Sequence, residues 1–298
     1  MELPKRSVAT HLNFSPMLFY QQLRGELHKL YARPRSWMGY GAFLIMEALI
    51  LFVYKLDGSQ RHMRGMLARN GLEFGTYYSS LTITLTIMLI SMFLLGSIFF
   101  ALVAGDIVAK ESEDGNLRMV FARPVSRLRL LLVKYAAVSI YTLSFTFFVG
   151  FSAYLMAVLA LGRDGGLFVM ATHMKVIAAY PDWWEGASRL LVAAAGLGVS
   201  MLTLSSLAFM FSCFKIKPAA ATIMTLTFLF VDLVLQGFPF FKPYESYFIT
   251  WRMSAWVFFL EHHRSWPKLI KAYAFLIGLD VALFTAGWAA FRARDFKT

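Results

Sequence analysis

Long apolar runs alternate with polar segments along the whole chain. Six of these runs are long enough to cross a bilayer, since about 20 apolar residues in a helix suffice. They cover residues 37–55, 78–104, 131–160, 187–212, 219–237 and 270–290. The third run exceeds the thickness of the hydrocarbon layer, so we expect its first turns, including Lys134, to stand in the aqueous phase. The pattern predicts an all-α membrane protein with six spans in one domain, residues 1–298.

The first 36 residues contain no long apolar run but carry the pattern of an amphipathic helix. Ser15 and Pro16 are typical of a helix start, because the hydroxyl caps the first turn and Pro suits the first helical position. Apolar side chains then share one face of the helix: Phe19, Leu23, Leu27, Leu30 and Tyr31. We expect this helix to lie on the cytoplasmic membrane surface. A helix packed on a soluble partner is the alternative.

Three segments between the spans are predicted to lie on the opposite side of the membrane. Residues 57–77 are polar and read as a loop, and residues 161–186 read as a second loop that turns at Asp164. Residues 238–269 form the longest and least regular of the three. Within them, residues 247–260 are aromatic and apolar but too short to cross, which predicts a re-entrant or interfacial segment before the sixth span.

Composition and charge exclude several functional classes. With 58 % hydrophobic residues among 298, the chain has far too much apolar surface for a water-soluble enzyme. The net charge of +12 lies mostly at the membrane boundaries, so we expect the lipid bilayer as a partner and no nucleic acid. Lys and Arg are denser in the segments on the side of the two termini, which favours a cell inner-membrane protein with both termini cytoplasmic.

The stretch from residue 105 to 130 is the one long charged segment between two strongly apolar runs. Acidic residues precede Gly115, and Leu117, Val120 and Phe121 then recur at helical spacing. Pro124 prevents continuation of that helix. The pattern predicts a short amphipathic surface helix between the second and third spans. Both signs of charge beside apolar side chains favour a docking surface for a protein, and an ordinary interfacial loop is the alternative.

No nucleotide-binding or hydrolytic motif occurs in the chain. None of the 20 Gly residues is followed by Lys, so a phosphate-binding loop of the Walker type is absent, and no catalytic residue is assigned. Three acids lie inside the apolar runs: Glu47, Asp232 and Asp280. Burying a charge in the bilayer is costly, so each is expected to face protein or water. They are candidate pathway residues, or else packing residues bonded to neighbouring helices.

His and Met side chains gather at several points of the three outer segments. The groups are His62, Met63 and Met66, then Met170, His173 and Met174, and finally Glu261, His262 and His263. Such ligands suit copper, but a chain with 16 Met and six His scatters them in this way by chance. We therefore predict no metal site and no cofactor in this chain.

The charged stretch carries a series of short motifs in a fixed order. They are Gly105-Asp106, Lys110-Glu111, Glu113-Asp114-Gly115-Asn116-Leu117, Arg123-Pro124-Val125-Ser126-Arg127 and Lys134. This series resembles the ABC-2 type permeases, in which an acidic-Gly-Thr-Leu run and a Pro-Val-Ser-Arg run link the second and third spans. Asn116 stands where Thr is commoner, and residues 291–295 resemble the family's ending.

The resemblance implies a type V ABC exporter permease that dimerises and binds two copies of a separate cytosolic ATPase. ATP and Mg would be bound by that partner, so this chain would not be an enzyme. The resemblance also implies that the coupling helix, seated in a cleft of the ATPase, consists of Glu111, Glu113, Asp114, Gly115, Leu117, Phe121, Arg123 and Pro124. The family's pathway runs between two permeases beside the first, second and fifth spans, which would place Glu47 and Asp232 near it.

Two other functions stay open at this point. A membrane-embedded lipid-modifying transferase would use Glu47, Asp232 or Asp280 as its base and requires at least two of these acids to converge on one cavity. An ATP-independent membrane scaffold would recruit soluble proteins without stimulated ATP turnover. The transported substrate, the direction of transport and the choice between homodimer and heterodimer do not follow from the sequence.

Overall fold

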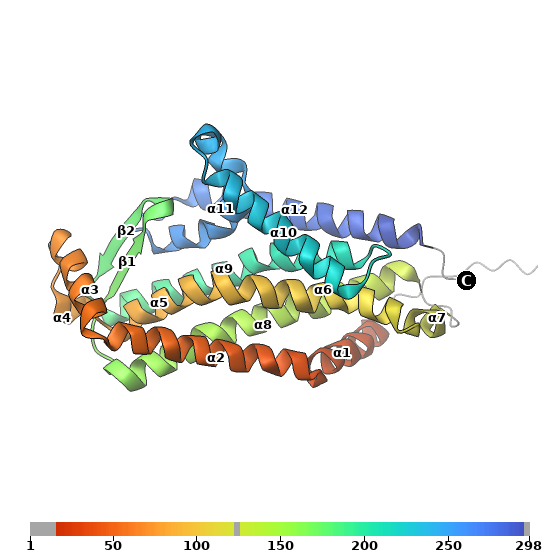
Figure 1. Cartoon of the computed structure of the whole chain (residues 1–298), viewed down its shortest axis with the longest axis horizontal. Coiled ribbons are helices and arrows are strands. Elements are labelled where there is room, and N and C mark those ends of the chain that lie inside the picture. The colour runs from red at the N-terminus through yellow and green to blue at the C-terminus, as the bar shows by residue number, and fades with distance from the viewer. Residues whose placement is uncertain (1–15, 122–125, 295–298) are drawn as a thin grey trace, which may run out of the picture.

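The computed structural model describes residues 16–121 and 126–294. Within these residues, six helices are long and apolar enough to cross a membrane, as predicted. They are α2 (Pro34–Lys55), the joined pair α5 (Ser80–Ser91) and α6 (Ser97–Glu113), α8 (Arg127–Leu161), α9 (Trp183–Ser212), α10 (Pro218–Gln236) and α12 (Trp266–Arg292). These helices run along the long axis of the molecule and form an elongated bundle (Figure 1). We call the end with α1, α7 and the α9–α10 turn the α7 end, and the opposite end the hairpin end.

Two of the long helices, α8 and α9, begin at a capping side chain. Ser126 accepts a hydrogen bond from the backbone N of Arg129 at 3.2 Å and starts α8. Asp182 likewise accepts one from the backbone N of Glu185 at 2.9 Å, so α9 begins at Trp183, one turn before the predicted start. Each cap satisfies a backbone N–H that has no partner inside its own helix.

Helix α9 forms the centre of the bundle and α10 lies at its edge. In the most apolar 18-residue stretch of α9, 67 % of the residues are buried within the chain, and α9 contacts α6, α8 and α12. In the corresponding stretch of α10, 11 % of the residues are buried. A helix that is apolar on all sides but mostly exposed within its own chain must bury its free faces in lipid or in another protein.

The second span is interrupted by a π-helical turn, η1 (Met92–Gly96), between α5 and α6. A π turn holds more residues than an α turn and therefore shifts the faces of the helix that follows. Helix α5 packs mainly on α8 and α2, whereas α6 packs mainly on α9 and α10. The two halves of this span thus have different neighbours.

The hairpin end differs from the prediction of loops in residues 57–77 and 161–186. Residues 57–77 form α3 (Asp57–Arg69) and α4 (Phe74–Tyr77). Strands β1 (Leu167–Ala171) and β2 (Val176–Tyr180) pair antiparallel and are joined by the short helix η2 (Thr172–Met174). Met63 and Leu67 of α3 pack with Phe168 of β1, which buries the apolar face of α3. Apart from this two-stranded sheet, the regular elements of the described residues are helical.

Three short helical segments connect α10 to α12, where the sequence predicted a segment too short to cross. They are η3 (Pro239–Tyr247), α11 (Ile249–Met253) and η4 (Ser254–Leu260). Segment η3 projects with the end of α10 from the side of the bundle (Figure 1) and buries none of its residues. By contrast, η4 packs on α9 and buries most of its side chains.

Helix α1 (Pro16–Ala32) carries the predicted apolar face, and this face packs on α8. Leu30 is 2 % exposed, and Leu23 and Leu27 pack against the same core. The hydroxyls of Tyr31 and Ser144 share a hydrogen bond of 2.5 Å. Helix α1 is therefore attached to a span by its apolar face.

Candidate functional site

The connection between α6 and α8 contains one short helix, α7 (Asn116–Phe121), at the end of the bundle. Gly115 has a φ of 74°, a left-handed conformation that costs Gly little, and it reverses the chain between α6 and α7. Leu117 is 1 % exposed and anchors α7 in the core. The predicted helix after Gly115 is thus present.

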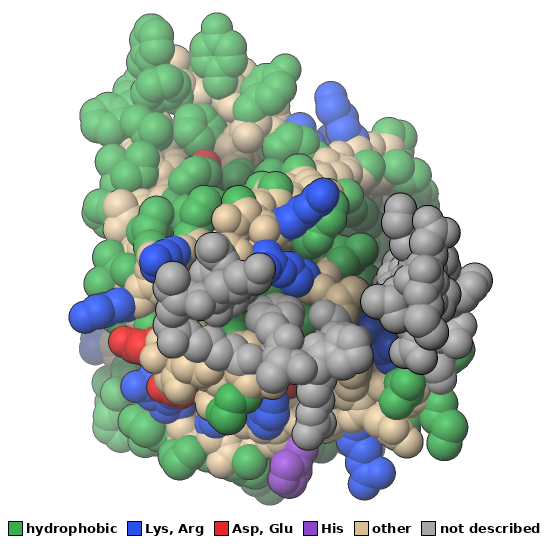
Figure 2. Space-filling view, turned by 90° about the vertical axis from the view of Figure 1, so that its right-hand side faces the viewer, with side chains coloured by type: hydrophobic (Ala, Val, Ile, Leu, Met, Phe, Trp, Pro, Cys, Tyr) green, Lys and Arg blue, Asp and Glu red, His purple; other side chains and the backbone are tan. Residues whose placement is uncertain are grey.

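Four exposed residues around this reversal form what we call the α7 surface: Glu113, Asp114, Asn116 and Met119. Met119 is 68 % exposed and adds a large apolar side chain to this surface. Figure 2 views this end and shows Lys and Arg side chains gathered on it, with acidic side chains among them. Arg123 and Pro124 lie outside the described residues, as does the side chain of Phe121.

Glu111 is not part of the α7 surface, because its carboxylate faces the interior. It is 7 % exposed, and its Oε2 lies 2.7 Å from Nζ of Lys134. Lys134 Nζ also lies 2.9 Å from Oε2 of Glu26, and Lys29 Nζ lies 2.7 Å from Glu26 Oε1 and 3.5 Å from Glu111 Oε1. The four side chains form a closed ring of alternating charge, which we call the charge ring, across α1, α6 and α8.

The expectation that Lys134 stands in water is wrong. Its side chain is 0 % exposed, and the two glutamates replace the water that an ammonium group would otherwise bind. Burial alone would raise the pKa of the Glu26 carboxyl, but Lys134 and Lys29 outweigh it and lower that pKa. Burial also opposes the charge of Lys29, yet Glu26 and Glu111 raise the pKa of its ammonium group.

Two arginines connect the end of α12 to α6, α8 and the α9–α10 turn at the α7 end. Arg294, just after α12, donates hydrogen bonds to the hydroxyl of Ser112 on α6 and, at 3.3 Å, to the carbonyl O of Cys213. Arg127 of α8 donates to the carbonyl O of Arg292 at 2.7 Å. Burial raises the pKa of the Cys213 thiol to about 12, so this side chain is an inert packing group rather than a nucleophile.

The candidate pathway residues Glu47 and Asp280 lie inside the bundle. Glu47 of α2 is 0 % exposed and accepts a hydrogen bond from the hydroxyl of Ser152 on α8 at 2.9 Å. Asp280 of α12 is 8 % exposed and lies beside the hydroxyls of Thr203 and Ser206 on α9. Each acid faces hydroxyl groups of a neighbouring helix, the packing arrangement that the sequence left open.

Asp232 of α10 joins its helix to α11. Its carboxylate accepts hydrogen bonds from the backbone N of Ile249 at 3.3 Å and the backbone N of Thr250 at 2.9 Å. It also accepts one from the Thr250 hydroxyl at 2.6 Å. Asp232 therefore caps the first turn of a helix other than its own.

The three intramembrane acids do not come together. Glu47 is bonded to α8, Asp280 lies against α9 and Asp232 caps α11. None of the three lines the apolar groove between α5, α8 and α9 or the small cavity between Arg33 and Lys110. A lipid-modifying transferase required at least two of them in one cavity, so the structure does not supply the arrangement that this function needs.

Met side chains of the first two outer groups share one apolar cluster, in which Met66 and Met170 pack against Met63 and its neighbours. Within the described residues, no group of three or more His, Cys, Asp or Glu side chains is placed to hold a metal ion. Met63 packs into the core of α3, and His262 lies against the ring of Tyr180 with 5.0 Å between ring centroids. These side chains pack locally at the hairpin end.

A wide apolar groove opens between α5, α8 and α9. Its volume is about 670 Å³, and its walls include Met88, Phe147, Tyr154 and Leu191. Trp183 lies at the start of α9 and closes the groove toward the hairpin end. A groove of this chemistry accepts hydrocarbon and offers no charged group for catalysis.

Comparison with protein families places these observations in a known group. A family model described as ABC-2 family transporter protein matches residues 22–232, from α1 to α10. Comparison with curated proteins finds no match. Because the matched segment includes the charge ring, α7 and five of the spans, and covers well over half of the chain, the chain belongs to the ABC-2 family transporter proteins and is a membrane-embedded permease without ATPase activity of its own.

Proposed function

We propose that this permease is the transmembrane subunit of an exporter driven by a cytosolic ATPase that docks on the α7 surface. The family implies an ATPase partner, and that partner would bind ATP and Mg²⁺. The observation that carries the docking site is the exposure of Glu113, Asp114 and Met119 beside the buried anchor Leu117. An exposed apolar side chain with polar groups at its rim is typical of a protein interface.

The α7 surface is built so that a push on it moves several helices together. Gly115 and Leu117 connect α7 to the end of α6, and Glu111 on the last turns of α6 is bonded to Lys134 of α8. Lys134 is bonded in turn to Glu26 of α1. In this proposal Glu111 acts as an anchor behind the docking surface. Phe121, Arg123 and Pro124 complete the coupling region beyond the described contacts.

We place the α7 end in the cytoplasm of a cell with the permease in its inner membrane. The Lys and Arg side chains gathered on this end support that orientation, because positive charge favours the cytoplasmic side. In this orientation α1 lies at the cytoplasmic membrane surface, attached to α8. The segment η3 to η4 then lies in the outer half, where its short helices form a re-entrant or interfacial segment.

A second copy of the permease accounts for the exposed faces of α2 and α10. Helix α10 buries only Ala221, Thr225 and Leu229, one narrow row four residues apart. Its other faces carry Ile223 and Phe230, which are 62 % and 67 % exposed. In the proposed dimer these faces meet the partner copy, the transport pathway runs between the two copies, and two ATPases bind beneath them.

Charge reversal of the α7 surface tests this function. The variant Glu113→Lys/Asp114→Lys should lose the ATPase during affinity purification from native membranes, by at least about tenfold, because like charges across an interface cost several kcal/mol. The measurement is quantitative mass spectrometry of co-purified nucleotide-binding subunits. The matched control is Asp57→Lys/Asp164→Lys, which reverses two exposed acids at the hairpin end.

Equal recovery of the ATPase with both variants would contradict the docking site. Recovery of a partner without ATP turnover would instead support the ATP-independent scaffold. Glu111 is left out of the variant, because its reversal would break the charge ring and confuse docking with folding.

A further inference from the structure

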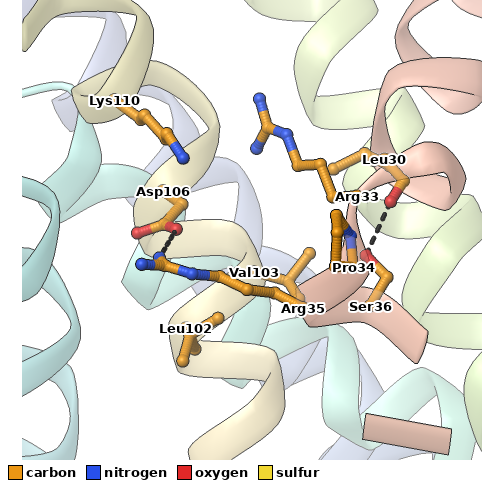
Figure 3. A pocket seen from close by; sticks show the side chains of 9 residues that line it. All are labelled: Leu30, Arg33, Pro34, Arg35, Ser36, Leu102, Val103, Asp106 and Lys110. Carbon is orange, nitrogen blue, oxygen red and sulfur yellow. Dashed lines mark hydrogen bonds and ion pairs between the residues drawn. The ribbon is translucent and has the colours of Figure 1, made fainter. Parts of the chain in front are cut away.

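A small cavity lies where α1 passes into α2, against the side of α6 (Figure 3). Its volume is about 280 Å³. Its charged groups are the side chains of Arg33, Arg35, Asp106 and Lys110. Leu30, Leu102 and Val103 supply its apolar wall. The cavity thus combines three cationic side chains, one carboxylate and a hydrocarbon surface.

The charges in this cavity are unbalanced. Arg35 Nη1 lies 2.8 Å from Oδ2 of Asp106, whose side chain is 7 % exposed, so this carboxylate neutralises one of the cations. Arg33 and Lys110 act on Asp106 only through their electric field, and their side chains have no hydrogen bond or ion pair to any described residue. In Figure 3 they extend from opposite walls toward the space beside the Arg35–Asp106 pair.

The cavity stands at the level of the lipid headgroups. Helix α2 begins at Pro34, and Trp37 one turn later is 64 % exposed and donates its ring N–H to the carbonyl O of Tyr31 at 2.9 Å. Exposed Trp at the start of a span is typical of the membrane–water boundary. Leu102 and Val103 lie about one helical turn before Asp106 on α6, toward the hydrocarbon.

We propose that this cavity binds the phosphate group of an anionic membrane lipid. Arg33 and Lys110 donate to the phosphate oxygens, and Arg35, oriented by Asp106, offers its remaining N–H groups to the same ligand. The first part of an acyl chain lies against Leu102 and Val103. A lipid held here braces the junction between α1 and α2, since Arg33 is the residue between these helices.

Lipid binding to the purified permease, without any ATPase, tests the proposal. Native mass spectrometry during titration with phosphatidylglycerol gives the affinity of the first bound lipid. We expect Arg33→Gln/Lys110→Gln to weaken it by about 30-fold, because each Lys or Arg near an anionic surface contributes about 1 kcal/mol. The matched control, Lys215→Gln/Lys217→Gln, removes two exposed cations from the α9–α10 turn at the same end and should leave the affinity unchanged. Equal affinities for the two variants would overturn the proposal.

A variant of opposite sign separates binding from misfolding. Asp106→Asn removes the competing negative charge and should strengthen phosphatidylglycerol binding by about fivefold. Weaker binding by this variant would overturn the charge argument.

Inorganic phosphate distinguishes the two possible sources of the ligand. We expect it not to displace the lipid at equal concentration, because it makes no contact with Leu102 and Val103. Displacement at equal concentration would overturn the assignment to a lipid and give the site to soluble phosphate.

Discussion

The two ends of the bundle are held together by different interactions. At the α7 end, charged side chains cross between helices: Lys134 of α8 joins Glu26 of α1 to Glu111 of α6, and Lys29 contacts the same two carboxylates. At the hairpin end, the strands pair from Leu167–Tyr180 to Ala171–Val176, and the Tyr180 hydroxyl donates to the carbonyl O of Leu260 at 2.7 Å. The ion pairs at the hairpin end include exposed side chains, such as Glu185 with Arg189.

This difference predicts that the α7 end moves more easily than the hairpin end. Charged side chains attract over several ångströms and tolerate changes in angle, so a charge ring keeps its helices together while they shift. Backbone pairing permits a single register, because a slip by one residue turns every side chain to the wrong face. A partner that pushes on α7 therefore meets the end of the bundle that accommodates movement.

The largest expected effect on stability comes from the removal of Lys134. Lys134→Met removes the buried cation that Glu26 and Glu111 share and leaves them only the exposed Lys29, which should destabilise the permease by about 3–5 kcal/mol. Thermal unfolding in detergent measures the loss. Adding Glu26→Gln and Glu111→Gln to the same chain should restore most of it, because no buried charge is then left unpaired. A single variant as stable as the native chain would show that the ring contributes nothing.

A smaller loss is expected from crowding the hairpin end. A Cβ on Gly166 would lie 2.2 Å from the carbonyl O of Tyr180, so Gly166→Ala must displace backbone and should cost about 1–3 kcal/mol. Gly65→Ala on α3 is the control, since nothing lies within 4 Å of its added Cβ. Equal thermal stability of the two variants would mean that the hairpin end is as tolerant as the α7 end.

The pH dependence of stability should differ between the two ends. The pKa of Glu26 is lowered from 4.5, so its contribution is complete above that pH and is lost as the pH falls through the lowered value. The pKa of Lys29 is raised from 10.5, so its contribution is complete below that pH and is lost as the pH rises through the raised value.

The melting-temperature difference between the native chain and Glu26→Gln measures this dependence. It should stay constant between about pH 5 and 10 and shrink under more acidic conditions. The decrease in melting temperature caused by Gly166→Ala should not change over the acidic range, because no titrating group takes part in that contact. A parallel decline of both differences would remove the distinction between the ends.

The smallest effect is expected from the outer cation of the charge ring. Lys29 shares both glutamates with Lys134, but its side chain is 55 % exposed. Lys29→Gln should therefore cost below about 1 kcal/mol, as for other ion pairs in contact with water. A loss as large as that of Lys134→Met would show that burial is not what makes Lys134 important.

The spans and α7 were predictable because their signals are local. Apolar runs of sufficient length, the cap at Ser126 and the chain reversal at Gly115 all depend on residues close together in the sequence. The β hairpin and α3 were not predictable in this way. Helix α3 is stabilised when Met63 and Leu67 meet Phe168, about a hundred residues later, and a short apolar run does not by itself distinguish a strand from a loop.

The sequence predicted the exposed part of the candidate site but not its buried part. Glu113 and Asp114 are exposed as a docking surface requires, whereas Glu111 is buried. The partner of Glu111 follows it by 23 residues, and Glu26 lies 108 residues from the lysine that joins them. The available signal was Lys134 itself, a lone charge in a long apolar run, which in lipid requires an opposite charge beside it.

In the proposed exporter, the π-helical turn η1 sets how far a displacement that starts at α7 travels across the bilayer. Phe93 and Leu94 on this turn are 52 % and 50 % exposed, so no neighbouring helix of the same chain fully encloses it. In the proposed orientation, the cytoplasmic half of the second span is then free to twist about its own axis while the outer half stays packed on α8. Torsion produced by the proposed ATPase would be released at mid-membrane, and the leaflet beside the strands would stay nearly still.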